Sequence, residues 1–568
     1  PAAAELKARG NERFKEGKFG EAYLAYSRAI AAINLERLEE LQAPPVIETP
    51  QDVLRAAIPI PDDFDPALHA AALKNPDNAN LFYALLANRA AVAARLGLYR
   101  RALVDVDAAL VVRPGDARAR LRRAHVLTSL QRYDEALELW KDLSVEFQGD
   151  KDVAKMERKV RRRMQEAEGV FDFFEVDTEN MERARLGAAL GLEEYADYVG
   201  PIEVVEIAGK GRGVVASENI TRGTLLLCDR ALVVVESGSS AITLAIDEKR
   251  KRMNTESQIR SISELLQRMK GDDGFAQRVY NLYAGGVEKP SLDGKGTLPL
   301  DHLFVQSAVY FNAFDPQMVP RVADPPVVPR GGKKTEMTGL WSRASMFNHS
   351  CVPNTTRNTA GQSMMIFANT DIRAGDEVTV AYCPPEFPLA KRTEVCEQFG
   401  FRCTCHLCEY QRNTTSENIE LRGQLLEQWE EEVLPQLNSP TTAIEPFLLF
   451  LDKFNATYAP NSPYEYEKVE ILNIIGMLYE SRQEYSLARE YYTQAFRASS
   501  GRDPQFCKLV YRAVICGSMN LERSSIPERE RLIDEMDELY ALYALRAGGD
   551  REVAERMVIR DESISNGR

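Results

Sequence analysis

Apolar positions in the first 170 residues recur with the spacing of packed helices. A pattern of mostly small or aromatic residues separated by 12, 4 and 3 positions occurs three times in this stretch and once near the C-terminus. Small residues at these offsets let two helices approach closely, so each set predicts one packed helix pair. The four sets are Gly10, Ala22, Tyr26 and Ala29; Ala90, Ala102, Val106 and Ala109; Ala124, Ala136, Trp140 and Leu143; and Gly476, Ala488, Tyr492 and Ala495.

The distance between the sets indicates the kind of helical array. Ala102 and Ala136 are 34 residues apart, the period of a tetratricopeptide (TPR) helix pair. Ala22 and Ala102 are 80 residues apart, which is one such period plus 46 residues. Seven prolines lie between Pro44 and Pro76. Because proline lacks a backbone donor, we expect a proline-rich insertion at about 34–79 that runs over the surface with at most short helices.

The apolar pattern changes to that of short strands in the middle of the chain. Residues 202–235 read as strands separated by glycine-rich turns, and strand patterns return at 363–368 and 377–382. Residues 240–285 have a helical pattern, and the prolines and glycines of 315–335 predict a loop.

These patterns predict an α+β multidomain chain. We expect helical arrays on both sides of a β-rich centre. The predicted domains are a TPR array with its insertion and a closing helix at 1–170, a β-rich domain with a helical insert (about 237–335) at 171–410, and a TPR-like helical domain at 411–568.

Charge and hydropathy restrict the partners. The 568 residues carry 71 Lys and Arg against 85 Asp and Glu, a net charge of −14. This excess argues against nucleic acid and favours basic partners. The apolar runs are shorter than the ~18 residues of a membrane span, and residues 1–7 resemble a helix more than a signal sequence. We therefore expect a cytoplasmic or nuclear protein without a membrane partner.

Cysteine spacing predicts a metal. Six of the nine cysteines fall within 58 residues, and three of them form a C-x-C-x-x-C cluster at Cys403, Cys405 and Cys408. Three thiols leave tetrahedral Zn²⁺ one ligand short, and Cys351 is the strongest candidate for the fourth. His406 is an alternative to one thiol, and a set of buried reduced cysteines without metal is the alternative to the whole site. We predict one structural Zn²⁺ on the four cysteines.

Four motifs in fixed order resemble those of SET-domain lysine methyltransferases: the Gly209-Lys-Gly-Arg-Gly turn, Asn348-His-Ser-Cys-Val-Pro-Asn, Asp376-Glu-Val-Thr-Val-Ala-Tyr, and the C-x-C-x-x-C cluster. The helical insert with Tyr310-Phe-Asn-Ala-Phe and the C-terminal helices are similar to the SET-and-MYND (SMYD-like) type. The resemblance implies a knotted, β-rich SET domain and a post-SET zinc segment at 386–410. Since Cys228 is the only cysteine before Cys351, we expect no MYND zinc module.

The same resemblance implies transfer of methyl groups from S-adenosyl-L-methionine to a lysine of a protein or peptide. Such a displacement relies on alignment and electrostatics, which a tyrosine hydroxyl can supply. A glycine turn, a capping asparagine, a core histidine and a strand-end tyrosine are the ordinary structural alternatives. The implied roles are catalysis by Tyr382; cofactor binding by Lys210, Gly211, Arg212, Asn312, Asn348, His349, Tyr382 and Phe401; and a substrate channel lined by Phe399 and Phe401. The family often has a second tyrosine at the position of Phe399, so the number of methyl groups added stays open.

The N-terminal array holds a second candidate site. Two amides and three cations at first-helix positions are similar to the carboxylate clamp of TPR co-chaperones, which holds acidic C-terminal tails of chaperones. They are Lys7, Asn11, Asn88, Arg118 and Arg122. The alternative is a set of solvated helix faces. For the whole chain, the second hypothesis is a peptide- or chaperone-binding scaffold with a catalytically idle SET domain.

Overall fold

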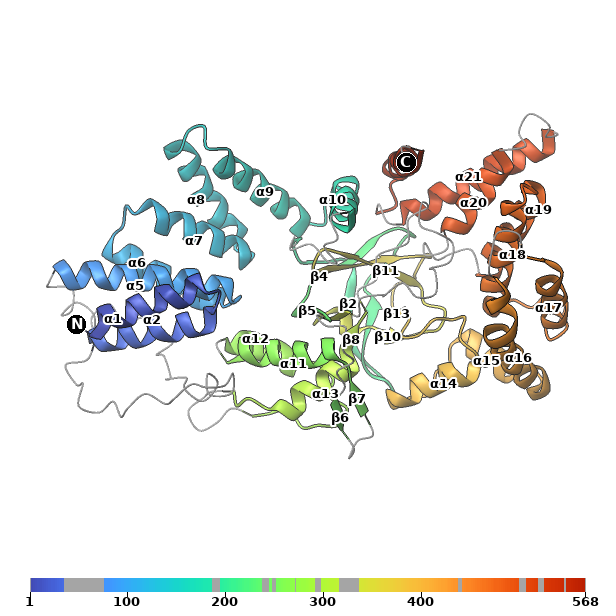
Figure 1. Cartoon of the computed structure of the whole chain (residues 1–568), viewed down its shortest axis with the longest axis horizontal. Coiled ribbons are helices and arrows are strands. Elements are labelled where there is room, and N and C mark those ends of the chain that lie inside the picture. The colour runs from blue at the N-terminus through green and yellow to red at the C-terminus, as the bar shows by residue number, and fades with distance from the viewer. Residues whose placement is uncertain are drawn as a thin grey trace. The chain divides into compact units, whose positions relative to one another are not determined.

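The computed structural model describes most of the chain as helices and strands (Figure 1). The predicted proline-rich insertion and the predicted loop at 315–335 lie almost wholly outside the described residues. The residues that the structure describes are 2–34, 76–185, 195–237, 245–247, 252–270, 272–291, 298–315, 337–437, 442–499, 507–518, 526–545 and 548–566. Among them, no helix combines the length and the apolar character needed to cross a membrane.

Contacts within the chain define two compact units. The first contains Pro1–Glu168, Ile259–Leu282 and Val287–Ala308. The second contains Gly169–Gln258, Tyr283–Gly286 and Val309–Arg568. Much of the predicted helical insert therefore belongs to the unit of the N-terminal helices.

The first unit is a helical array. Packed helix pairs are formed by α1 (Ala2–Lys15) with α2 (Phe19–Asn34), α5 (Pro76–Arg95) with α6 (Tyr99–Val112), and α7 (Ala117–Ser129) with α8 (Tyr133–Glu146), followed by α9 (Lys151–Ala167). The small repeat residues lie at the helix contacts: Ala22, Ala102 and Ala136 are all fully buried. A Cβ atom at Gly10 would lie only 2.6 Å from the Tyr26 ring. The predicted helix pairs are confirmed. α5 begins at Pro76, because proline is favourable in the first turn of a helix.

The insert contributes further helices and one hairpin. Its helices are α11 (Glu256–Met269), α12 (Asp273–Tyr280) and α13 (His302–Asn312). The helical prediction for 240–285 is wrong at its start, because β6 (Ala245–Asp247) and β7 (Arg252–Asn254) pair as an antiparallel hairpin. Both strands are three residues long, too short to establish a period.

The second unit contains the β-rich centre. The first sheet has the strand order β1 (Tyr198–Val199), β4 (Leu225–Arg230), β12 (Ser363–Ala368) and β11 (Thr355–Ala360). The second sheet has the order β10 (Asn348–His349), β13 (Glu377–Val380), β3 (Gly211–Ala216) and β2 (Ile202–Ile207). The third sheet has the order β5 (Val233–Glu236), β9 (Met337–Leu340) and β8 (Ala313–Phe314). Of these pairs, β10 with β13 is parallel and the others are antiparallel. All six residues of β12 are buried, as expected for an apolar central strand. The predicted strands are confirmed.

Helices follow the β-rich centre to the C-terminus. They are α14 (Leu389–Gln398), α15 (His406–Arg412), α16 (Ser416–Gln428), α17 (Glu445–Asn455), α18 (Val469–Ser481), α19 (Tyr485–Ala498), α20 (Cys507–Ser518), α21 (Ile526–Ala544) and α22 (Arg551–Asn566). The α18–α19 pair repeats the close contact of the N-terminal array, because a Cβ atom at Gly476 would lie 2.8 Å from the Tyr492 ring. α10 (Phe173–Arg185) packs against α22. Helices α16 to α22 share one apolar core.

Candidate functional site

The predicted cofactor turn between β2 and β3 is joined to Asn348 by a carboxylate. Gly209 and Gly211 have φ angles of 75° and 72°, a region in which glycine meets no steric penalty. The exposed Lys210 between them makes an ion pair with Glu377. Asn348 Nδ2 donates to the other oxygen of the same carboxylate at 2.9 Å. Glu377 therefore holds two predicted cofactor residues together.

Arg212 and Gly213 follow the turn on β3. Arg212, beside Gly211, is exposed. A Cβ atom at Gly213 would lie 2.5 Å from Asn348 Nδ2. A side chain at position 213 would therefore displace the Asn348 amide, which the glycine leaves in place.

Asn312 is buried at the end of α13. Its side chain is engaged within the protein, since Nδ2 donates to the Tyr283 carbonyl at 2.7 Å. Its own carbonyl accepts from the Ser345 hydroxyl at 3.5 Å. Asn312 thus lies beside the segment that leads into Asn348.

Tyr382 lies at the centre of an aromatic group. Its hydroxyl donates to the Phe347 carbonyl at 2.8 Å. The ring centroids of Phe399 and Phe401 are 5.1 and 6.2 Å from that of Tyr382, and that of His349 is 5.2 Å away. Burial, followed by the negative charge of Glu377, raises the pKa of Tyr382 to about 12, so the hydroxyl keeps its proton at neutral pH.

The aromatic group extends toward the surface through two residues of the insert. Phe311 lies 6.1 Å from Phe399, ring centroid to ring centroid, and Tyr283 lies 5.1 Å from Phe311. Tyr283 is 53% exposed. A continuous row of rings therefore leads from solvent to Tyr382.

Four thiols gather next to this group. Cys351, Cys403, Cys405 and Cys408 have their sulfur atoms within 4.8 Å of one another. The Sγ of Cys351 lies 3.9 Å from that of Cys403 and 3.5 Å from that of Cys408. Four sulfurs at ~2.3 Å from a tetrahedral Zn²⁺ are about 3.8 Å apart, so the set fits the ion. His406 is exposed and is not part of the group.

His349 lies between the thiols and the tyrosine. Its Nδ1 accepts from the Tyr382 backbone N–H at 3.0 Å. Its Nε2 lies 3.2 Å from the Cys351 sulfur. The ring is 9% exposed and also neighbours Phe401, at 5.9 Å between ring centroids.

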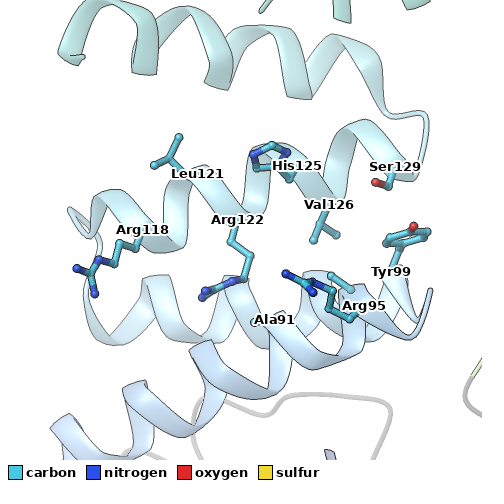
Figure 2. A pocket seen from close by; sticks show the side chains of 10 residues that line it. Ala91, Arg95, Tyr99, Arg118, Leu121, Arg122, His125, Val126 and Ser129 are labelled. Carbon is cyan, nitrogen blue, oxygen red and sulfur yellow. The ribbon is translucent and has the colours of Figure 1, made fainter. Parts of the chain in front are cut away.

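The N-terminal array contains a groove of about 420 Å³ between α5 and α7 (Figure 2). Arg118 and Arg122 of α7 line it together with Arg95 of α5. No carboxylate is among its described lining residues, and the apolar residues that line it include Ala91 and Leu121. Burial lowers the pKa of Arg122; the neighbouring Tyr83 and Asp116 oppose this effect, and the Arg118 guanidinium adds a smaller lowering. The three arginines of the lining outnumber this one carboxylate, so the groove keeps an excess of positive charge.

The other predicted clamp residues do not line this groove. Asn11 Oδ1 accepts from the Tyr26 hydroxyl at 2.8 Å and from Asn88 Nδ2 at 3.2 Å. The two amides are thus bonded to each other, while Lys7 is partly buried on α1. Arg95 was missed by the sequence reasoning, because no repeat position marks it.

Two residues of the central site were also missed. Glu377 begins β13 and gave no signal beyond its place in the Asp376-Glu-Val-Thr-Val-Ala-Tyr motif. Asn354 fixes the same strand, because its Oδ1 accepts from the Thr379 N–H at 2.8 Å and its Nδ2 donates to the Glu377 carbonyl at 2.9 Å. The second amide of the Asn348-His-Ser-Cys-Val-Pro-Asn motif is the signal that points to Asn354.

Comparison with known proteins gives a match to one family model and to several proteins named as methyltransferases. Residues 211–383 match the family model described as SET domain. A protein of Gibberella zeae named methyltransferase is 23% identical over 374 residues, covering 63% of this chain and 51% of that protein. The histone-lysine N-methyltransferase SET5 of Eremothecium gossypii is 32% identical over 85 residues (15% and 17%). Human histone-lysine N-methyltransferase SMYD3 is 32% identical over 74 residues (13% and 17%).

The matched part of the chain spans about half the length of the Gibberella zeae relative and less of the other two. Among solved structures, that of yeast Tom70 aligns with 100% of this chain and 95% of its own at 10% identity, with a TM-score of 0.20, a value at which two folds are not considered alike. Residues 211–383 therefore form a SET domain, and proteins named as methyltransferases are among the chain's relatives.

Proposed function

We propose that this protein transfers methyl groups from S-adenosyl-L-methionine to a lysine side chain of a protein substrate. The observation that carries the proposal is the meeting of Tyr382 and His349, within the segment that matches the SET domain, with Phe399 and Phe401 beside a four-thiol cluster. The cofactor supplies a methyl group on a positively charged sulfur. Lys210, Gly211, Arg212, Asn312, Asn348 and His349 are the proposed cofactor-binding residues.

Tyr382 acts in this proposal as a neutral hydrogen-bonding group. With a pKa of about 12, its hydroxyl does not serve as a base at neutral pH. It instead orients the acceptor amine, which is a matter of alignment. The rings of Phe399 and Phe401 provide apolar surroundings that disfavour a charged ammonium, so the lysine is held in the neutral form that reacts.

Cys351, Cys403, Cys405 and Cys408 are the proposed ligands of one structural Zn²⁺. A closed set of four thiolates has no open position for substrate. The ion's role is therefore to fix the segment that carries Phe401 to the residues that follow β10, the strand that pairs with β13. We also propose the SMYD-like type without a MYND module.

A labelled-cofactor assay tests the activity. Purified protein is incubated with S-adenosyl-L-methionine carrying a labelled methyl group and with a protein extract, and labelled lysines are identified by mass spectrometry. Tyr382→Phe is expected to abolish labelling, because the hydroxyl that orients the amine is lost. Tyr485→Phe, in the C-terminal helices, is the matched control and retains it. Labelling of no lysine by the wild type, or equal labelling by Tyr382→Phe, refutes the proposal and favours a scaffold with an idle SET domain.

We further propose that the N-terminal groove binds an acidic peptide, such as a chaperone C-terminal tail. Three arginines and several apolar side chains in one lining suit carboxylates beside an apolar side chain. Binding of a fluorescent Glu-Glu-Val-Asp peptide is expected to weaken about 10- to 100-fold in Arg122→Ala, as for loss of one charged hydrogen bond. Arg132→Ala, which removes an ion pair with Glu135 outside the groove, is the control. Equal binding by all three proteins contradicts this assignment.

A further inference from the structure

The His349 ring is hydrogen-bonded at both nitrogens to different parts of the site. β10 pairs in parallel with β13, so that His349 lies opposite Val380. β13 ends at Val380, and Tyr382 follows beyond the last residue of the ladder. Its N–H therefore has no strand partner and donates to His349 Nδ1 at 3.0 Å. On the other side of the ring, Nε2 lies 3.2 Å from Cys351 Sγ.

These contacts fix the tautomer of the ring. A backbone N–H only donates, so Nδ1 carries a lone pair and no proton. The proton of the neutral imidazole is then on Nε2. Nε2–H points at Cys351 Sγ, and a metal-bound thiolate accepts such a hydrogen bond well.

The same contacts exclude His349 as a ligand of a second ion. His349, Cys351 and Cys383 also have ligand atoms within 4.8 Å of one another. However, metal binding needs a free lone pair on one ring nitrogen. Nδ1 uses its lone pair for Tyr382 and Nε2 carries the proton, so the ring is a hydrogen-bonding link.

We propose that His349 is a positioning residue that couples the cysteine centre to Tyr382. The link runs from the Cys351 thiolate through Nε2–H and Nδ1 to the Tyr382 N–H, and from there to the hydroxyl held by the Phe347 carbonyl. The four-thiol centre thereby fixes the strand end that presents Tyr382. The link rests on the proposed zinc centre for its thiolate, whereas the hydrogen bonds themselves do not depend on methyl transfer.

Two variants separate the halves of this link. His349→Asn keeps an acceptor oxygen at the place of Nδ1 and removes the donor to sulfur, whereas His349→Ala removes both. His406→Asn is the matched control, because His406 is exposed and adjacent in sequence to a proposed ligand. Each protein is prepared with Co²⁺ in place of Zn²⁺, and two quantities are measured: the sulfur-to-cobalt charge-transfer absorption, and the hydrogen exchange of a peptide that contains Tyr382.

Loss of an N–H···S bond leaves more electron density on sulfur, so the absorption band moves to longer wavelength. We expect this shift in His349→Asn and His349→Ala but not in His406→Asn. Exchange at the Tyr382 amide is expected to become about three- to tenfold faster in His349→Ala, as for loss of one hydrogen bond, and to change less in His349→Asn. An unshifted band in both His349 variants, or unchanged Tyr382 exchange in His349→Ala, overturns the proposal.

A measurement on the wild type covers the case in which the variants do not fold. The chain contains five histidines, so ¹⁵N-histidine labelling gives a simple spectrum in which the tautomer of each ring is read from its nitrogen shifts. A buried ring protonated at Nε2 alone supports the link, and the absence of such a ring overturns it. Wild-type protein that binds no Co²⁺ refutes the zinc centre, and the tautomer then decides the link to Tyr382 separately.

Discussion

A fully buried carboxyl group, that of Asp229, makes the stability of the SET segment depend on pH. Asp229 on β4 accepts from the backbone N–H groups of Arg343 and Ala344 at 2.7 and 3.1 Å. It thus holds the short 3₁₀ turn Ala344–Met346, which leads directly to Asn348. Burial, followed by the negative charge of Asp197, raises its pKa from 3.8 to about 6, against the opposing effect of the Arg343 guanidinium.

The sign and size of the effect follow from this shift. A carboxyl group with a raised pKa binds its proton more tightly in the folded protein, so its contribution to stability is present at low pH and is lost as the pH rises through about 6. Two pKa units correspond to about 3 kcal/mol. Asp229→Asn cannot ionise, so the wild type should lose about 3 kcal/mol of unfolding free energy relative to this variant between about pH 4 and pH 7.

Urea unfolding of both proteins across this pH range measures the difference. Any pH-independent cost of the amide cancels, because only the change of the difference with pH is compared. Asp197→Asn is a second test: it removes the neighbouring negative charge, so the pH dependence should become smaller without disappearing. A difference between wild type and Asp229→Asn that stays constant from pH 4 to 7 would refute the reasoning.

Three further predictions concern the metal, the repeat and the channel. Cys405→Ser should lower the zinc content measured by atomic absorption from one ion per chain toward zero, because three thiolates leave the tetrahedral site incomplete; unchanged stoichiometry contradicts the ligand set. Gly476→Ala should destabilise the C-terminal helices by about 1–3 kcal/mol in thermal unfolding, since its Cβ would lie 2.8 Å from the Tyr492 ring; an unchanged midpoint contradicts the close packing. Phe399→Tyr adds a hydroxyl near Tyr382, whose ring centroid is 5.1 Å away, and should reduce the number of methyl groups added per lysine in a mass-spectrometric assay; an unchanged product distribution contradicts the placement of Phe399 in the channel.

Helix pairs and strands were predictable because their signals are local. The repeat positions combine a fixed offset with small side chains, and Gly10 and Gly476 occupy the same place against a tyrosine in the two arrays. The strands β4 and β12 each contain an unbroken apolar run, Leu225–Cys228 and Met364–Ala368, and both runs are buried. The β6–β7 hairpin was missed, because three residues per strand leave no period to detect.

The candidate site was predictable in its residues but not in its connections. The order of the motifs predicted Cys351 as the fourth ligand beside the C-x-C-x-x-C cluster, and the structure places those four sulfurs together. It did not indicate that Glu377 joins Lys210 to Asn348, because side chains that meet across strands carry no mark in the sequence. The groove of the N-terminal array shows the same limit: Arg95 comes from a different helix than Arg118 and Arg122.

The side chains of β13 alternate between buried and partly exposed positions, so this short strand contributes residues to both the core and the candidate site. Side chains on a strand point to opposite faces in turn, and here Val378 and Val380 are buried in the core while Glu377 and Thr379 are partly exposed. Tyr382 continues the core-facing series, and its ring packs against that core. Its amide, however, lies beyond the last ladder pair and is available to His349. A strand two residues longer would pair this amide with a neighbouring strand, so the end of β13 at Val380 is what allows His349 to fix Tyr382.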